Sequence, residues 1–238
     1  DGIILVCPSK VADAKMKMYN LDGSEGKMCG NGIRCVGKFL YDHGMVDINE
    51  KDEITIETLS GIKKLKAYTS GGKVNRLRVD MGKAILEPKE IPVVLDGDKV
   101  VDRPVEIAGK NYNITCVSMG NPHCVVFMDD IDNLDIETVG PEFENDKLFP
   151  ERVNTEFVTV LDDHTIKMRV WERGSGETWA CGTGACAVAV AACENGFCKK
   201  GEDIKIKLKG GDLIINYTDE TVYMTGNAEK VFEGEVEV

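Results

Sequence analysis

The sequence has 238 residues, a formal net charge of −12, nine cysteines and three histidines. This length suits one large domain or two of ordinary size. No apolar run is long enough to span a membrane, and the acidic chain lacks the clustered Lys and Arg that bind nucleic acid. The cysteines lack the dense, regular spacing of a disulfide scaffold, so we expect free thiols in the reducing cytoplasm.

The first half of the chain predicts several strands and one helix. The helix is expected from about Ile33 to His43, where apolar residues follow a 3.6-residue period and Gly44 suits its end. Apolar or alternating runs predict strands at 3–6 (buried), 15–19, 54–58, 64–67 and 76–79. The stretch 87–104 contains three prolines and an Asp-Gly-Asp turn, so we expect the connection between two domains there.

The second half predicts the same order of elements. Its helix is expected from Ala185 to Cys193, where nearly every residue is small or apolar, as in a helix that is buried on all sides. A helix of this kind is best covered by a sheet that curves around it. Strands are predicted at 115–118, 124–127, 157–161, 166–171, 204–208, 213–217 and 222–224.

One sequence unit occurs twice, at an offset of 152 residues, the difference between 181 and 29. Cys29 in the stretch Met28–Arg34 (M-C-G-N-G-I-R) corresponds to Cys181 in the stretch Glu172–Ala187 (E-R-G-S-G-E-T-W-A-C-G-T-G-A-C-A). Without gaps, the same offset pairs Lys15 with Lys167, Glu25 with Glu177, Gly30 with Gly182, Gly32 with Gly184 and Gly44 with Gly196. This period is too long for a solenoid, so the pattern predicts two similar domains, at 1–110 and 111–238.

Each repeat places a thiol at the expected start of its helix. Unpaired backbone N–H groups and the positive end of the helix dipole favour a thiolate there, and the same groups can hold an anion. If the two domains face each other across a cleft, Cys29 and Cys181 would lie on opposite walls. One thiol could then remove a Cα proton while the other protonates the opposite face, which inverts the centre.

Other roles for these cysteines remain open from the residues alone. A lone Cys before a glycine is more often structural than catalytic, but the repetition with Gly-x-Gly after both thiols favours catalysis. Neither cluster has four ligands at zinc-binding spacing, so no metal is expected. Cys29 and Cys181 could also form a disulfide in an inactive, oxidised state. Cys35 and Cys186 are expected to be core residues one turn inside their helices.

Several polar residues near the repeats are candidates for substrate contact. His123 follows Asn121-Pro122 in a turn and has no apolar helical face to fill, so it is expected to tune one thiol. Glu172 and Arg173 come just before the loop that carries Cys181. Asn20 occupies the place of Glu172 in the first repeat, and Asn154 precedes a strand; either Asn could simply stabilise its turn.

These motifs together resemble the diaminopimelate epimerase family. The resemblance is carried by Y-N-L-D-G-S-E-G-K-M-C-G-N-G-I-R-C at 19–35, S-M-G-N-P-H at 118–123, R-V-N at 152–154 and the stretch around Cys181. It implies an α/β (α+β) fold of two pseudo-symmetric domains, each a barrel-like, mostly antiparallel sheet around a central helix. It also implies a cytoplasmic, often homodimeric enzyme without cofactor or metal that interconverts LL- and meso-2,6-diaminopimelate for lysine and peptidoglycan-precursor synthesis.

The resemblance also implies roles for individual residues. Cys29 and Cys181 would be the two bases, and His123 and Glu172 would tune them. The substrate would be bound by Asn20, Gly30, Asn31, Asn121, Asn154, Glu172, Arg173, Gly182 and Thr183. Family members have a further substrate-binding segment before the position of Asp1, so we expect the first domain to lack its N-terminal strands here.

Two further functions remain open. Proline and hydroxyproline racemases share the paired cysteines, but they resemble this chain less around Asn20, Glu172 and Arg173. A distal charged amino-acid group on the substrate explains that polar set better, because Arg173 can bind a carboxylate with two hydrogen bonds. The third possibility is a non-catalytic, redox-responsive binding protein built on the duplicated fold.

Overall fold

A computed structural model describes residues 2–48 and 53–235. The chain divides into two compact units: the first holds Asp1–Val79 and Thr225–Val238, and the second holds Asp80–Met224. Strands β6 (Lys73–Gly82) and β15 (Val222–Asn227) each run from one unit into the other. The division predicted near residue 110 stays a prediction.

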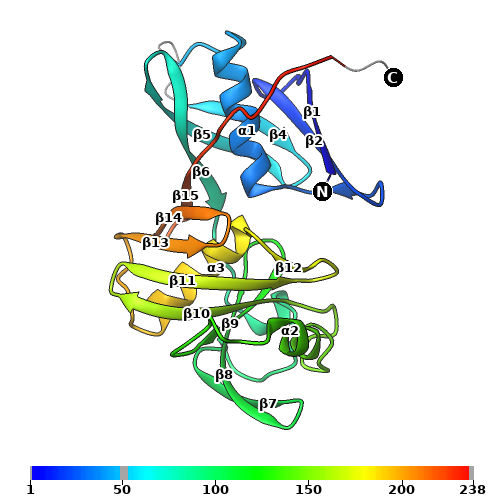
Figure 1. Cartoon of the computed structure of the whole chain (residues 1–238), viewed down its shortest axis with the longest axis vertical. Helices are drawn as coiled ribbons and strands as arrows, with labels where there is room; N and C mark the ends of the chain where they lie inside the picture. Colours follow the sequence, from blue (N-terminus) through cyan, green and yellow to red (C-terminus); the bar gives the residue numbers. More distant parts are fainter. Residues whose placement is uncertain (1, 49–52, 236–238) are drawn as a thin grey trace. The chain divides into compact units, whose positions relative to one another are not determined.

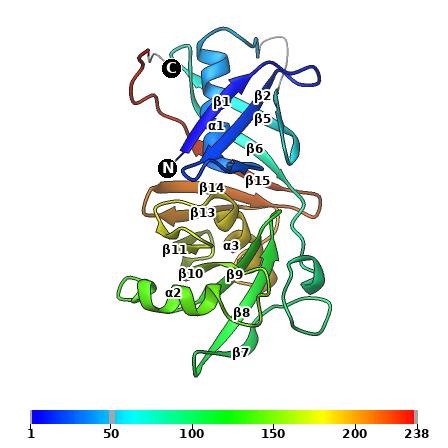
Figure 2. The same ribbon diagram turned by 90° about the vertical axis from the view of Figure 1, so that its right-hand side faces the viewer.

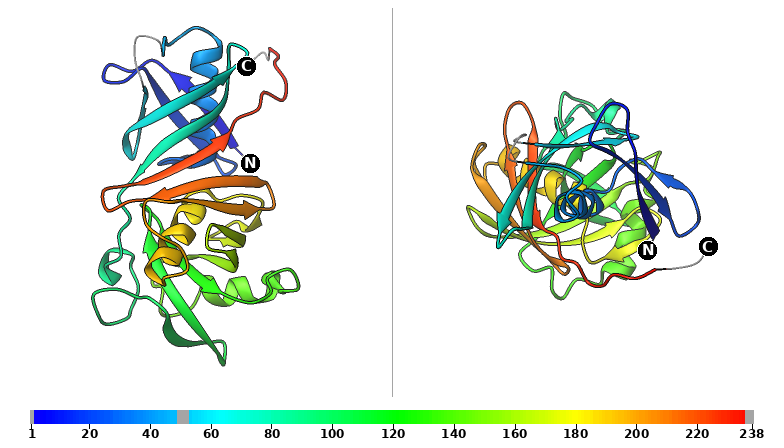
Figure 3. Two further views of the ribbon diagram at one scale, coloured as in Figure 1. Left: turned by 90° about the vertical axis from the view of Figure 1, so that its left-hand side faces the viewer. Right: turned by 90° about the horizontal axis from the view of Figure 1, so that it is seen from above.

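The first unit packs helix α1 (Gly30–Asp42) against a sheet (Figures 1 and 3). Within the unit the strands lie in the order β1-β2-β4-β5-β6. Neighbours are antiparallel except β2 and β4, and α1 contacts β4 and β5. The strands are β1 (Gly2–Cys7), β2 (Ala14–Asn20), the short β3 (Glu25–Gly26) beside β2, β4 (Ile54–Thr58), β5 (Gly61–Ser70) and β6.

The second unit wraps its sheet around helix α3 (Gly182–Glu194), as Figure 2 shows. The order is β7-β8-β9-β10-β11-β13-β14, with parallel pairs at β9–β10 and β11–β13. Helix α3 contacts β8, β9, β10, β13 and β14. The strands are β7 (Arg103–Ile107), β8 (Lys110–Ser118), β9 (Pro122–Phe127), β10 (Asn154–Asp162), β11 (Thr165–Glu172), β12 (Gly176–Thr178) beside β11, β13 (Asp203–Leu208) and β14 (Gly211–Tyr217).

A second core in this unit lies beside helix α2 (Ile136–Glu144). Phe143 of α2 and Phe157 of β10 are fully buried and meet edge to face, with ring centroids 5.4 Å apart. The segment that contains the 3₁₀ turn η1 (Pro88–Glu90) adds Ile91, Val93 and Val100 to this cluster. The stretch predicted to join two domains therefore contributes to a hydrophobic core.

The predicted α/β class, with mostly antiparallel strands and one long helix per repeat, is confirmed. Two local predictions are wrong. Strand β1 is not buried: the exposed fractions of Ile3 and Leu5 are 58% and 40%, because in the described chain β1 is an edge strand that pairs with β2 alone. Cys35 is exposed on α1, whereas Cys186 on α3 is buried as predicted.

Candidate active site

Both repeated thiols cap a helix in the same way. Cys29 is the N-cap residue of α1 with φ −130° and ψ 115°, and Cys181 is the N-cap residue of α3 with φ −119° and ψ 111°. The backbone N–H of Gly32 donates to Cys29 Sγ at 3.3 Å, and that of Gly184 donates to Cys181 Sγ at 3.4 Å. The sulfur therefore takes the place of the hydroxyl or carboxylate oxygen that usually caps a helix.

In the first unit, the N-terminus of α1 brings three of the predicted site residues together. Cys29 and Asn31 are half-buried, and Gly30 is buried. The Gly30 carbonyl accepts a hydrogen bond from Arg34 Nη1 at 3.0 Å, and Arg34 Nε donates to the Asn227 carbonyl at 3.2 Å. The buried Arg34 side chain thus ties the first turn of the helix to the end of β15.

Asn20 lies at the end of β2, in the turn that leads to β3. Its Nδ2 donates to Ser24 Oγ at 3.0 Å, and the turn is closed by backbone hydrogen bonds from Asn20 N to the Ser24 carbonyl and from Gly23 N to the Asn20 carbonyl. Gly23 has φ +82°, a conformation that favours glycine. The turn fixes an exposed Asn20, so its role in substrate binding stays a prediction.

In the second unit, a buried polar cluster surrounds Cys181, whose exposed fraction is only 6%. Thr183 Oγ1 lies 3.5 Å from Cys181 Sγ, and Asn121 Nδ2 donates to Thr183 Oγ1 at 3.3 Å. His123, on β9, is fully buried, and its Nε2 lies 3.1 Å from Asn121 Oδ1. The structure therefore joins four of the predicted site residues in one hydrogen-bonded group.

The electrostatics of Cys181 differ from those expected of a helix N-terminus. Burial raises the pKa of the Cys181 thiol well above its usual range, and the nearby carboxyl groups of Glu172 and Glu156 raise it further. The hydrogen bonds from Thr183 and the Gly184 N–H act in the opposite direction but are smaller. The prediction of a favoured thiolate is wrong at Cys181, because removal from water outweighs the helix dipole.

Asn154 and the residues after β11 are bound to one another. Asn154 Nδ2 donates to the Pro122 carbonyl at 2.8 Å, and its Oδ1 accepts from the Arg173 N–H at 3.0 Å. Arg173 Nη1 donates to the Glu151 carbonyl at 2.8 Å, and Glu172 accepts a hydrogen bond from Thr178 Oγ1. These bonds hold the loop before Cys181 in place, whereas contact with substrate stays a prediction.

The sequence analysis missed one residue of this cluster, Glu156. It lies on β10 with its side chain fully buried, and its Oε1 is 2.7 Å from His123 Nδ1. β10 pairs with β9 along one edge and with β11 along the other, and its first five residues are all buried, so both faces of the start of the strand are covered. The signal in the sequence was a single charge at the edge of the apolar run 157–161.

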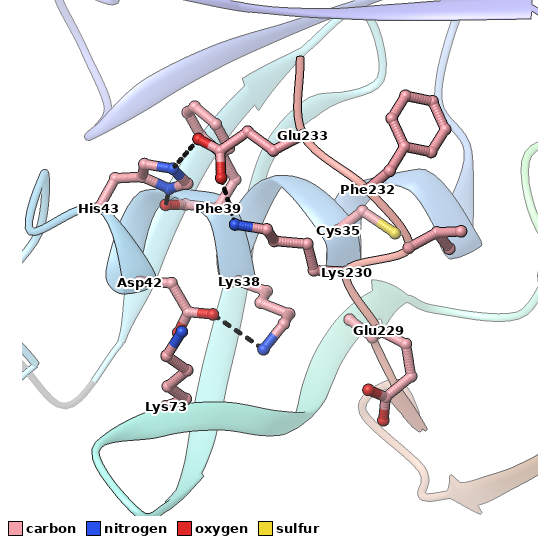
Figure 4. A pocket seen from close by; sticks show the side chains of 12 residues that line it. Cys35, Lys38, Phe39, Asp42, His43, Lys73, Glu229, Lys230, Phe232 and Glu233 are labelled. Carbon is pink, nitrogen blue, oxygen red and sulfur yellow. Dashed lines mark hydrogen bonds and ion pairs between the residues drawn. The ribbon is translucent and has the colours of Figure 1, made fainter.

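A separate pocket lies in the first unit between α1 and the chain segment 228–233 (Figure 4). Lys38 and Asp42 of α1 form an ion pair at 2.8 Å on its wall, and Lys230 and Glu233 pair on the segment opposite. None of the predicted site residues lines this pocket. In the described part of the chain, no helix is both long and apolar enough to cross a membrane.

The sequence matches the family model described as diaminopimelate epimerase over residues 1–87 and 115–231. The chain belongs to the diaminopimelate epimerase family. A relative from Acetivibrio thermocellus with that name is 53% identical over 240 residues, which cover 100% of this chain and 84% of the relative. One from Methanococcus maripaludis is 51% identical, with 100% and 85% covered. The family resemblance predicted from the paired thiol motifs is therefore confirmed.

Solved structures also share the fold of this diaminopimelate epimerase family member. A probable proline racemase from Agrobacterium radiobacter superposes with a TM-score of 0.72 at 17% identity, covering 95% of this chain and 73% of that one. A PhzF-family phenazine biosynthesis protein from Bacillus anthracis gives 0.70 at 19% identity, covering 100% and 85%. At these identities the likeness shows the fold alone.

Proposed function

We propose that the protein interconverts LL- and meso-2,6-diaminopimelate without a cofactor, with Cys29 and Cys181 as its two acid/base groups. The family membership carries the choice of reaction. The identical capping of α1 and α3 by Cys29 and Cys181 supports the choice of thiols, since a duplicated helix cap gives two similar groups for two faces of one carbon.

In this scheme one thiolate removes the proton from the substrate α-carbon, and the other thiol delivers its proton to the opposite face. The Cα–H bond breaks on one side and a new one forms on the other, so the thiols exchange protonation states in each turnover. Cys181 starts as the proton donor, because its raised pKa keeps the proton on sulfur at neutral pH. Inversion requires both sulfurs to reach opposite faces of the same carbon.

The first turns of the two helices supply the group that binds the carboxylate at the reacting centre. N–H groups in a first turn have no partner within the helix, and the helix dipole favours an anion beside them. We assign this role to Gly30 and Asn31 on α1 and to Gly182 and Thr183 on α3. As the proton leaves, negative charge spreads onto the carboxylate, and these donors stabilise it.

The remaining polar residues are assigned to the distal amino-acid group of diaminopimelate. They are Asn20, Asn121, Asn154, Glu172 and Arg173. Arg173 offers a guanidinium that suits a distal carboxylate, while the Asn and Glu oxygens can accept hydrogen bonds from a distal ammonium. His123 and Glu172 are assigned to tuning the thiols.

Solvent deuterium incorporation tests the proposal. The full-length protein is incubated with LL-diaminopimelate in deuterated water, with L-proline as the competing substrate. We expect deuterium at the α-carbon and formation of the meso isomer with diaminopimelate alone. Turnover of proline instead would favour the racemase alternative. Binding without exchange under reducing conditions would favour a non-catalytic, redox-responsive protein.

We also propose that the enzyme is a cytoplasmic homodimer, as the family resemblance implies. Sedimentation of the purified protein at micromolar concentration gives the mass directly, and a single species at the monomer mass would contradict the dimer.

A further inference from the structure

The His123–Glu156 pair is a fully buried polar contact of the second unit. Both side chains have 0% exposure, and His123 Nδ1 lies 2.7 Å from Glu156 Oε1. This distance falls in the range of charge-assisted hydrogen bonds between a cationic nitrogen and a carboxylate. In the part of the chain that the structure describes, the second carboxyl oxygen, Oε2, has no hydrogen-bond partner.

Such a buried carboxyl group is weak evidence for a stabilising role in the fold. A buried, half-satisfied carboxyl costs free energy, and replacing a buried ion pair with apolar side chains is often neutral or stabilising. Burial accordingly raises the pKa of Glu156, while the charge and hydrogen bond of His123 lower it. The role of Glu156 therefore lies in its effect on the residues around it.

The hydrogen bonds that start at Glu156 lead to the sulfur of Cys181. His123 Nε2 faces Asn121 Oδ1 at 3.1 Å, Asn121 Nδ2 donates to Thr183 Oγ1 at 3.3 Å, and Thr183 Oγ1 lies 3.5 Å from the sulfur. Because the Asn121 amide donates to Thr183, its oxygen is left to accept from His123. His123 must then carry a proton on Nε2, and a second proton lies in its bond to Glu156.

The direction of these bonds has a chemical consequence. Each donor points toward Cys181, from the His123 ring to the Asn121 amide and from that amide to the Thr183 oxygen. The Thr183 oxygen already accepts a hydrogen bond, so its own proton is available for the sulfur. A donor aimed at sulfur stabilises the thiolate, and hydrogen bonds in a chain polarise one another.

Glu156 also packs against the helix that Cys181 caps. A Cβ added at Gly184 would lie 2.5 Å from Glu156 Oε1 and 3.2 Å from Cys181 Cβ, so the carboxyl group touches the first turn of α3. The titratable groups around it are His123 and Cys124 on β9, Glu172 on β11 and Cys181.

We propose that Glu156 is a positioning residue for the reaction: its carboxyl group shares a proton with His123 Nδ1, so that Nε2 donates to Asn121. This orients Asn121 and Thr183 so that the Thr183 hydroxyl donates to Cys181 whenever that sulfur is the thiolate. This role rests on the proposed function, in which Cys181 alternates between thiol and thiolate. Its structural part, the proton shared between His123 and Glu156, is a property of the resting protein and is measurable without turnover.

The test uses Glu156→Gln, which keeps the size and hydrogen-bonding ability of the side chain but removes its charge. The matched control is Glu194→Gln at the far end of α3, where the carboxyl group pairs with exposed Lys99 and Lys200. The ring and its hydrogen bonds are observed by ¹H and ¹⁵N NMR at about pH 8, above the ordinary pKa of a histidine side chain. The sequence has only three histidines, and His43 and His164 are partly exposed internal references.

In the wild-type protein and in Glu194→Gln we expect a proton on His123 Nε2 and a second, downfield-shifted proton in the bond between Nδ1 and the Glu156 carboxyl group. Glu156→Gln should lose this downfield signal. In the deuterium assay, Glu156→Gln should lose roughly 10- to 100-fold in kcat while KM stays within about twofold. This loss is smaller than the ~10²–10⁴-fold contribution of an acid or base that itself transfers the proton.

A wild-type His123 ring without a proton on Nε2 or without the shared proton at Nδ1, or wild-type kcat in Glu156→Gln, would overturn the proposal. A folding defect in Glu156→Gln is recognised by circular dichroism and does not affect the wild-type NMR result. If the wild-type protein shows the shared proton but never exchanges deuterium, the proposed function fails, and the role of Glu156 in the reaction fails with it. The shared proton would then stand as an observation about the resting protein.

Discussion

Cys29 and Cys181 occupy the same place in two copies of one sequence unit, yet their surroundings differ. The backbone angles and the capping hydrogen bonds agree closely at the two sites. Cys29 is half-buried on a helix that is exposed along one side, where Cys35 and Phe39 reach the surface. Cys181 is buried beside carboxyl groups on a helix with an almost wholly buried apolar sequence.

The comparison teaches that a local motif sets geometry, whereas the surrounding fold sets protonation. Cys-Gly-x-Gly places a sulfur over the N–H groups of a first helical turn in both units. The pKa of Cys181 is nevertheless raised, because burial and two carboxyl groups outweigh that local environment. The two thiols of one enzyme thus need not begin the reaction in the same state.

The glycines after the two thiols provide the largest expected contrast. In Gly184→Ala, the new methyl group would lie 2.5 Å from Glu156 Oε1, which His123 holds in a fully buried site. In Gly32→Ala, it would meet Ile4 Cδ1, the end of a flexible and half-exposed side chain, at 2.2 Å. We expect Gly184→Ala to lower the free energy of unfolding by about 1–3 kcal/mol.

For Gly32→Ala we expect a smaller effect, because Ile4 can move and Ala gains about 0.5–1 kcal/mol over Gly inside a helix. Urea denaturation followed by circular dichroism measures both variants. Equal losses of unfolding free energy in the two variants would show that the first turns of α1 and α3 are packed alike. That result would contradict the difference between the two sites.

The reactivity of the two thiols provides the second contrast. At about pH 7.5 we expect iodoacetamide to modify Cys29 at least about tenfold faster than Cys181, because alkylation needs an accessible thiolate and Cys181 is buried with a raised pKa. Peptide mass spectrometry after timed quenching gives each rate. Fully buried Cys186 is the slow-reacting reference in the same samples. Faster modification of Cys181 would contradict the assignment of Cys181 as the resting thiol.

Alkaline stability provides a third, smaller contrast. Burial raises the pKa of Cys193 to about 12 and that of Cys198 to about 11, and it also raises the pKa of Cys124 and Cys181, all in the second unit. The unfolded chain therefore loses these protons first, from about pH 9 upward. The stabilisation is complete below that pH and declines as the pH rises toward about 11–12.

We expect a loss of up to about 1.4 kcal/mol per pH unit for each such thiol. Both tryptophans, Trp171 and Trp179, lie in the second unit, so their fluorescence during urea unfolding reports on that unit. An unfolding free energy that stays constant or rises between about pH 8 and pH 10 would contradict this prediction.

Much of the fold follows from hydrophobic patterns in the sequence. The strand predicted at 54–58 is β4, and the runs at 204–208, 213–217 and 222–224 lie within β13, β14 and β15. Helix α2 was missed, because Gly140 and Pro141 interrupt its short apolar pattern. Strands β3 and β12 are too short to leave a period-two pattern. They pair with the ends of β2 and β11 that β4 and β13 leave unpaired.

The candidate site was predictable where it is local and unpredictable where it depends on packing. The repeat identified both thiols and the glycines after them, since these residues act through neighbouring backbone. The exposure of Cys35 and the burial of Glu156 depend on which strands cover each position. Glu156 in particular looks like an ordinary surface charge until β10 lies between β9 and β11 and packs against α3.

The central claim is that one thiol removes the α-proton and the other protonates the opposite face of the same carbon. Variants that keep only one of the two thiols test this claim most directly. Cys29→Ala and Cys181→Ala are compared with Cys35→Ala and Cys186→Ala, the matched cysteines inside the same helices, in deuterated water with each diaminopimelate isomer. We predict that Cys29→Ala and Cys181→Ala each lose the interconversion of the two isomers. The thiol that remains in each variant should still exchange the α-proton of one isomer, without converting that isomer into the other. The two controls should invert normally. Near-normal interconversion of LL- and meso-diaminopimelate by either Cys29→Ala or Cys181→Ala would contradict the account.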